Sequence, residues 1–336
     1  IIALLCTAPA FAQENVYPAK PYAGLLFIRN AVVHVGNGTV LDNVTIQVSQ
    51  GKIQKIGKDL PIPMDDVKVF DVKGKHVYPG LILSNSLLGL VEVNSVRATI
   101  DHTEIGVYNP SIRSIVAYNT DSKVINTLRS NGILLANIVP QGGVISGSSS
   151  VVQLDAWNYE DAAYKMDNGI HLNMPNLLIR PGQSADGVKK SLDEIEGIKA
   201  FFREAQAYAS ETKHTTTNLK YEAVKGLFNR SQKLFVHCDI VKEMLVAVDF
   251  AKDFGMDVVI VGGSESYQLA PLLKANNIAV ILSQMHALPT LADDDVDQPY
   301  KSAAALQQAG VLFAINDEDG QTRGRNLPFN AGTAAA

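Results

Sequence analysis

The sequence has 336 residues, of which 29 are basic and 34 acidic, so its formal net charge is −5 with histidine neutral. Hydrophobic residues make up 46% and charged residues 19%, a composition typical of a globular chain with one or two domains. No run is rich in lysine and arginine, which argues against the clustered basic surface of a nucleic-acid partner. After the N-terminus, no stretch reaches the roughly 20 apolar residues of a membrane span.

The N-terminus predicts an exported, periplasmic or secreted protein. An apolar run over Ile1 to Leu5 precedes Ala10-Phe11-Ala12, the apolar core and A-x-A cleavage pattern of a signal peptide over 1–12. The run has no methionine or basic start, so it looks clipped. Cleavage after Ala12 would leave Cys238 as the single cysteine, which suits an exported protein that does not rely on disulfides.

The segment 22–78 predicts a small β-domain. It holds short Val- and Ile-rich runs separated by turn signals such as Gly36-Asn37-Gly38, a pattern typical of antiparallel strands. The runs are LLFIRNAVVHV, VTIQVS, KIQKIG and VKVFDV. A sheet of about 50 residues is too small to be stable alone, so we expect it to lean on further structure.

The segment 79–336 predicts a (β/α)8 barrel. Short apolar runs alternate with helical patterns, most clearly from Lys233 onward, as parallel strands buried on both faces require. The expected strands are LILSN, ILLANIV, VVQLD, HLNM, KLFVH, DVVIV, IAVIL and VLFAI. Eight strands is the count of such a barrel. Long helices are expected over 185–212 and 241–254.

Active sites of these barrels lie at the C-terminal ends of the strands. The residues expected there are Asn85, His237, Gly262, His286 and Asp317. In this set, His237 is the one good metal ligand whose strand-end position is clear, and Asp317 is the one carboxylate. His286 is interpreted as a loop residue.

The segment VYPGLILSNSLLGL after the small β-domain resembles the amidohydrolase superfamily, in its imidazolonepropionase-like and dipeptidase branches of metal-dependent hydrolases. There the motif Pro-Gly-Leu-Ile-Asp-x-His-x-His supplies two metal-binding histidines. The segments around His237, Gly262 and Asp317 agree in order, and the similarity runs from about Leu26 to the last residue. It implies a TIM-type barrel with an N-terminal β-sandwich segment, which strands from a C-terminal tail, absent here, would complete.

The resemblance implies that most metal ligands are substituted. The usual Asp falls on Leu83, the two histidines on Asn85 and Leu87, and the strand-six histidine on Gly262. His237 and Asp317 remain, at the positions of a strand-five metal ligand and of the aspartate that binds metal and acts as general base. A catalytic zinc site ordinarily has three protein ligands and a water. At most a weakly bound divalent ion such as zinc is therefore expected, and without it water keeps a pKa of about 15.7.

Two functions stay open. The first is a hydrolase of carbon–nitrogen bonds in cyclic amides or dipeptide-like small molecules, with His237 as residual metal ligand and Asp317 as base. The alternative is a catalytically inactive barrel that serves as a binding or partner domain, for a second amidohydrolase unit or another copy of the chain. A fold alone does not separate them.

The remaining candidates are weaker. Asp101, His102 and Glu104 form either a replacement ligand set or, as we favour, an exposed loop cluster. Other residues are expected to have structural roles: turn glycines at 142, 143 and 147, a helix N-cap at Ser264, solvated acids at Glu318 and Asp319, and histidines without partner spacing at His34, His76, His171 and His214.

Overall fold

The computed structural model describes residues 18–178, 186–291, 294–317, 320 and 322–336. The proposed signal segment 1–12, and Glu318 and Asp319, lie outside the described residues. Contacts divide the chain into two compact units that meet between Leu81 and Ile82. Each unit is treated by itself below.

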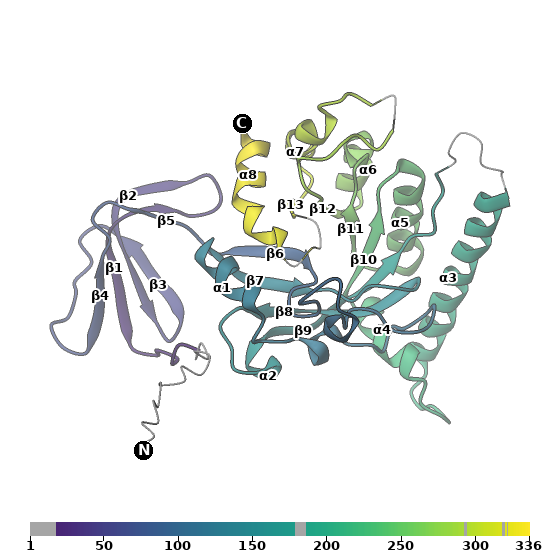
Figure 1. Ribbon diagram of the computed structural model, residues 1–336, viewed down its shortest axis with the longest axis horizontal. Helices are drawn as coiled ribbons and strands as arrows, with labels where there is room; N and C mark the ends of the chain where they lie inside the picture. The colour runs from purple at the N-terminus through teal and green to yellow at the C-terminus, as the bar shows by residue number, and fades with distance from the viewer. Residues whose placement is uncertain (1–17, 179–185, 292–293, 318–319, 321) are drawn as a thin grey trace, which may run out of the picture. The chain divides into compact units, whose positions relative to one another are not determined.

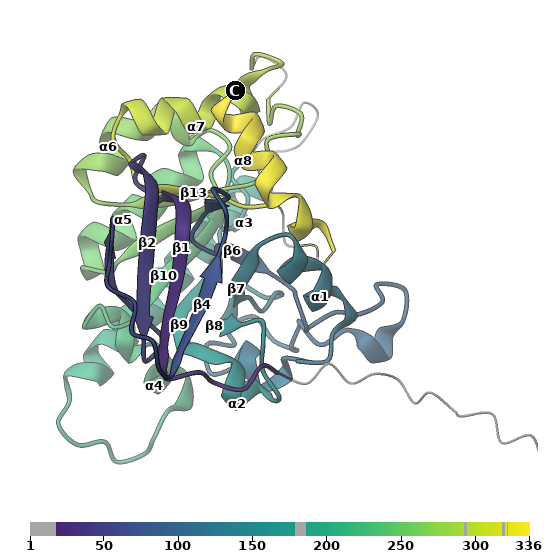
Figure 2. The ribbon, with the colours of Figure 1, turned by 90° about the vertical axis from the view of Figure 1, so that its left-hand side faces the viewer.

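The first unit is one five-stranded sheet (Figure 2). Its strands are β1 (Leu25–His34), β2 (Val40–Ser49), β3 (Lys52–Gly57), β4 (Val67–Asp71) and β5 (His76–Val77). The order is β3-β2-β1-β4, with β5 also on β1, and β4 and β5 run parallel to β1. Alternate residues point into a small core made by Ala31, Val33, Val44 and Ile46. The strand runs predicted for this segment are confirmed, but the expected antiparallel pairing is wrong for β4 and β5, which run parallel to β1.

The second unit is built around an eight-stranded sheet in the order β13-β12-β11-β10-β9-β8-β7-β6 (Figure 1). The strands are β6 (Leu81–Ser86), β7 (Ile133–Ile138), β8 (Ile145–Gln153), β9 (Ala163–Asn173), β10 (Lys233–Cys238), β11 (Val258–Gly262), β12 (Ala279–Leu282) and β13 (Phe313–Ile315). The predicted barrel is confirmed as a nearly closed sheet. Phe235, Val259, Val261 and Ile281 pack together as one apolar cluster of β10 to β12.

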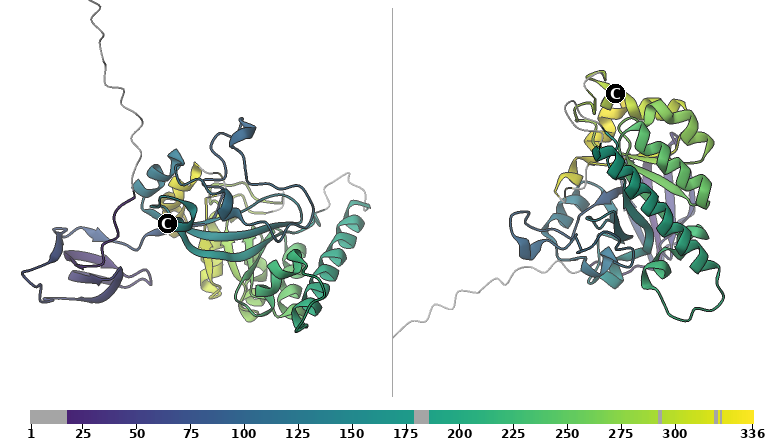
Figure 3. Two further views of the ribbon diagram at one scale, coloured as in Figure 1. Left: turned by 90° about the horizontal axis from the view of Figure 1, so that it is seen from below. Right: turned by 90° about the vertical axis from the view of Figure 1, so that its right-hand side faces the viewer.

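The helices of the second unit flank its sheet, and those that follow β9 in the chain cover the strands of its second half (Figure 3). They are α1 (Lys123–Ser130), α2 (Tyr159–Ala162), α3 (Asp186–Ser210), α4 (Leu219–Phe228), α5 (Val241–Phe254), α6 (Ala270–Ala275), α7 (Gln298–Gln308) and α8 (Leu327–Ala335). One core cluster joins α3 to α7 with β9 to β12, through side chains such as Phe202, Leu227 and Phe250. The helices predicted over 185–212 and 241–254 match α3 and α5. Among the described helices, none combines the length and apolar character that a bilayer crossing requires.

One strand departs from the parallel pattern. β8 runs antiparallel to both β7 and β9. Only the residues Val139–Val144 connect β7 to β8, whereas a parallel crossover needs a dozen or more residues. Gly142 and Gly143 have positive φ in this turn, as expected. The expected turn role is wrong for Gly147, which lies inside β8 and allows the Ile112 carbonyl to approach to 2.6 Å from where a Cβ would be.

The side chain of Asn316 joins the two ends of the sheet. Its Oδ1 accepts a hydrogen bond from the backbone N–H of Asn85 at 3.3 Å, and its Nδ2 donates to the Asn85 carbonyl at 2.9 Å. Within the described residues β13 and β6 form no ladder. Asn316 therefore supplies, from a side chain, the donor and acceptor that a neighbouring strand would offer to β6.

Candidate active site at the strand ends

A cavity of about 490 Å³ lies at the C-terminal ends of the barrel strands. Residues from the ends of β6, β9, β10, β11 and β12 contribute to its wall. They are Asn85, Met174, Asn176, Leu178, His237, Cys238, Asp239, Ile240, Glu243, Val261, Gly262, Ile281, Leu282, Ser283, Thr290 and Asn316. This is the face on which barrel enzymes carry their sites, and the volume suits a small molecule.

His237 reaches the cavity from β10 and is hydrogen-bonded to a second histidine. Its Nε2 lies 2.8 Å from Nδ1 of His171, which is completely buried in β9. The ring of His171 stacks on Phe235 at a centroid distance of 4.7 Å. The expectation that His171 has no partner is therefore wrong, because neighbouring parallel strands place the two imidazoles side by side.

The environment of His171 keeps its ring neutral. Burial lowers the pKa of His171 well below its usual value, and His237 lowers it further, so the ring is neutral. Its Nε2 is buried without a hydrogen-bond partner. Its Nδ1 shares one proton with Nε2 of His237, and the tautomer decides which of the two nitrogens donates.

Asp239 follows His237 at the entrance to α5 and is held by Ser264. The Ser264 hydroxyl donates to Asp239 Oδ1 at 2.7 Å, and its backbone N–H donates to the same oxygen at 3.3 Å. Ser264 is therefore not the helix N-cap that the sequence predicts. Gly262 makes room for this arrangement, since its φ is +100° and a Cβ there would lie 2.7 Å from Asp239 Oδ1.

Two buried glutamates fix the backbone around the cavity. Glu243 accepts hydrogen bonds from the backbone N–H groups of Leu177 at 3.0 Å and Asp239 at 3.3 Å. Glu265 accepts from the N–H of Val241 at 2.7 Å and so satisfies the first turn of α5. Both glutamates are expected to act by positioning the cavity wall.

The positions at which the family binds metal do not form a metal site. Leu83 is 1% exposed and packs against Gly324, and Gly262 has no side chain. Asp317 is buried, and Asn316, its neighbour, is the residue that lines the cavity. Within the described ranges, no three His, Cys, Asp or Glu side chains form a group that could hold a metal ion. The described residues therefore do not fit a zinc ion with three protein ligands.

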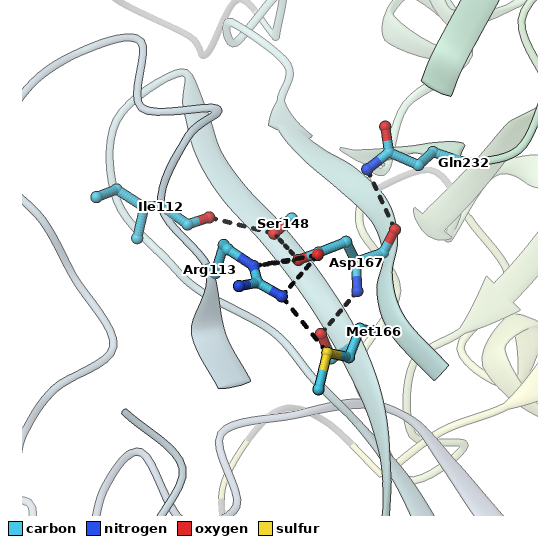
Figure 4. A network of polar contacts seen from close by, with 7 residues as sticks. Ile112, Arg113, Ser148, Met166, Asp167 and Gln232 are labelled. Carbon is cyan, nitrogen blue, oxygen red and sulfur yellow. Dashed lines mark hydrogen bonds and ion pairs between the residues drawn. The ribbon is translucent and has the colours of Figure 1, made fainter. Parts of the chain in front are cut away.

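The loop cluster Asp101, His102 and Glu104 lines a separate cavity of about 370 Å³. These side chains do not converge as metal ligands in the described part of the chain, and His102 Nδ1 lies 2.7 Å from the Thr103 hydroxyl. Arg113 lines the same cavity and belongs to a polar network that ties its own segment to β8 and β9 (Figure 4). In it, Arg113 Nε donates to both carboxylate oxygens of Asp167, at 2.9 and 3.1 Å.

Three other histidines have partners that the sequence analysis missed. His34 Nε2 lies 2.8 Å from His76 Nδ1 on neighbouring strands of the small sheet. His214 Nδ1 lies 3.0 Å from Glu211 and stacks on Tyr208. His286 is a loop residue, as expected, whose ring meets Tyr300 edge to face.

Solved structures share this architecture. An amidohydrolase from Thermotoga maritima MSB8 superposes with a TM-score of 0.76 at 21% identity, over 92% of this chain and 83% of that chain. Another amidohydrolase superposes with a TM-score of 0.51 at 14% identity, over 93% of this chain and 82% of its own. An uncharacterized protein gives 0.54 at 14% identity, over the same shares.

No protein-family model matches the sequence, and no curated protein matches it either. The structural similarities cover both the small sheet and the barrel, and they confirm the fold that the sequence resemblance implies. The chain has the fold of these amidohydrolase structures, a (β/α)8-type barrel with an N-terminal β-domain.

Proposed function

We propose that this chain is a hydrolase that acts on a carbon–nitrogen bond of a small molecule bound in the strand-end cavity. The observation that carries the proposal is His237 in the wall of a cavity of about 490 Å³ at the C-terminal face of the barrel. The amidohydrolase fold supports the reaction class. Cyclic amides and dipeptide-like molecules are the substrates that we propose, since both are of a size that the cavity accommodates.

Hydrolysis of an amide needs a group that takes a proton from water and one that gives a proton to the leaving amine. We propose His237 for these roles, because its imidazole lines the cavity and His171 orients it from the opposite side. The sequence assigns the base to Asp317. Asp317 remains the alternative candidate for the base, and substitution of each residue in turn distinguishes the two candidates.

The test is a hydrolysis assay on a panel of cyclic amides and dipeptides, with the metal content of the purified protein measured in parallel. We expect release of amine or ammonia from at least one class, and a loss of about 100-fold or more in His237→Ala. The control is Asp253→Asn, an exposed acid on α5 away from the cavity. Hydrolysis that survives His237→Ala but not Asp317→Asn would transfer the role of base to Asp317.

Metal content separates the remaining possibilities. We expect less than one equivalent of zinc, manganese or iron per chain. One tightly bound equivalent that is lost in His237→Ala would reinstate His237 as a metal ligand. A protein that binds members of the panel and hydrolyses none would instead be the inactive binding barrel.

Location and assembly are also proposed from the sequence. We propose export to the periplasm or the outside of the cell, which fractionation of cells expressing the full-length protein would test. A partner unit or a homo-oligomer would appear as excess mass in light scattering.

A further inference from the structure

The charged side chains in the wall of the strand-end cavity are acidic. The lining contains two carboxylates, Asp239 and Glu243, and, among the described residues, no lysine or arginine. Both oxygens of Glu243 are engaged with backbone N–H groups. Asp239 differs, because Ser264 engages only its Oδ1, and Oδ2 accepts no hydrogen bond from the described residues. One carboxylate oxygen is therefore available to a ligand.

A second acceptor in the same wall is unused. Asn85 lines the cavity and is only 9% exposed, and its Oδ1 is buried without a hydrogen-bond partner. Its backbone is held on both sides by Asn316, so the residue is fixed in place. A buried acceptor without a donor costs free energy, and a ligand N–H group that meets Oδ1 once the Asn85 amide turns toward the cavity would recover that cost.

The position of Asp239 is built into the fold. Any side chain at residue 262 would meet Asp239 Oδ1 at 2.7 Å, and φ of +100° at this residue favours glycine. The carboxylate thus occupies the space that a side chain at the end of β11 would fill. Two hydrogen bonds from Ser264 keep it there.

We propose that the cavity takes a substrate that carries a positively charged, N–H-rich group such as an ammonium, and that Asp239 binds this group. The proposal rests on the proposed function, because it names the substrate class of the same site. An ammonium offers three donors and one positive charge, which complement an open carboxylate oxygen and an unpaired amide oxygen. A neutral analogue of the same shape supplies neither the three N–H donors nor the positive charge.

The experiment compares two probes by calorimetry: alanyl-glycinamide, and propionyl-glycinamide, which has hydrogen in place of the amino group. We expect wild-type protein to bind the cation at least tenfold more tightly, and added salt to weaken that preference. Asp239→Asn keeps the shape of the side chain and should remove the preference. Asp253→Asn removes the same charge from the exposed face of α5 and should leave it intact.

The outcomes separate this inference from the proposed function. Equal affinity for the two probes, an unchanged preference in Asp239→Asn, or no binding of the cation at millimolar concentration would overturn the inference. Hydrolysis of neutral amides alone would keep the proposed function and overturn the inference. Selective binding of the cation without hydrolysis of any amide would keep the inference and overturn the proposed function.

Discussion

Asn316 offers a direct test of how the barrel is closed. It is 2% exposed, and its amide makes two hydrogen bonds to the backbone of Asn85, one to the N–H and one to the carbonyl. Asn316→Ala removes both bonds while it keeps the backbone. The two groups on β6 then lose the partner that the end of β13 provides.

The magnitude follows from the burial of these groups. Each buried polar group left unsatisfied costs about 1–3 kcal/mol. Asn85 lines the cavity, so water can reach part of the vacated space and keeps the cost near the lower end of that range. We therefore expect Asn316→Ala to lower the free energy of unfolding by about 2–3 kcal/mol.

The assay is equilibrium urea denaturation, with hydrogen exchange at the Asn85 amide as a local probe. The matched control is Asn276→Ala, whose Nδ2 donates one bond, to the carbonyl of Leu272 one turn back, and which should cost about 1 kcal/mol or less. A loss below about 0.5 kcal/mol in Asn316→Ala, with unchanged exchange at Asn85, would refute the closure role.

Three further predictions concern single groups. Gly262→Ala should destabilise the protein by about 1–3 kcal/mol in urea denaturation, because φ is +100° there and the new Cβ meets Asp239; an unchanged midpoint would contradict this. Burial raises the pKa of the Cys238 thiol well above its usual value, so native protein should react with a thiol reagent far more slowly than unfolded protein; equal rates would mean an accessible thiol. A hydrogen bond from Asn30, followed by one from Arg29, lowers the pKa of Asp71 from 3.8 to about 2. The stability that Asp71 contributes is present above pH 3.8 and is lost as the pH falls toward 2, and Asn30→Ala should raise the midpoint of the Asp71 NMR titration.

The second half of the barrel could be predicted from sequence because its physical signal is local. Parallel strands buried on both faces appear as unbroken apolar runs, and β10 to β13 are such runs, each of them followed by a helix. The antiparallel β8 was missed although the sequence held a sign of it. The six residues from Val139 to Val144 are too few for a crossover helix, and the serine-rich start of β8 does not look like a buried strand.

The sequence predicted a residue of the site only where its position along one strand is enough to place it. His237 follows a clear apolar run, so its place at a strand end could be read from the sequence. Its contact with His171 depends on the register between β9 and β10, in which Phe235 pairs with His171, and no spacing along the chain encodes that register. The bond between Ser264 and Asp239 likewise depends on the positive φ of Gly262.

Two positions to which the resemblance assigns metal ligands, Leu83 and Gly262, are parts of the packing in this structure. Leu83 packs against Gly324, where an added Cβ would lie 2.7 Å from its Cδ1, so an aspartate at position 83 would be buried among apolar atoms. A histidine at position 262 would collide with Asp239. A single substitution at either position would therefore be costly, at 83 by burying a charge and at 262 by the contact with Asp239. The proposed function accordingly rests on groups in the cavity wall, foremost His237, and the further inference rests on the open oxygen of Asp239.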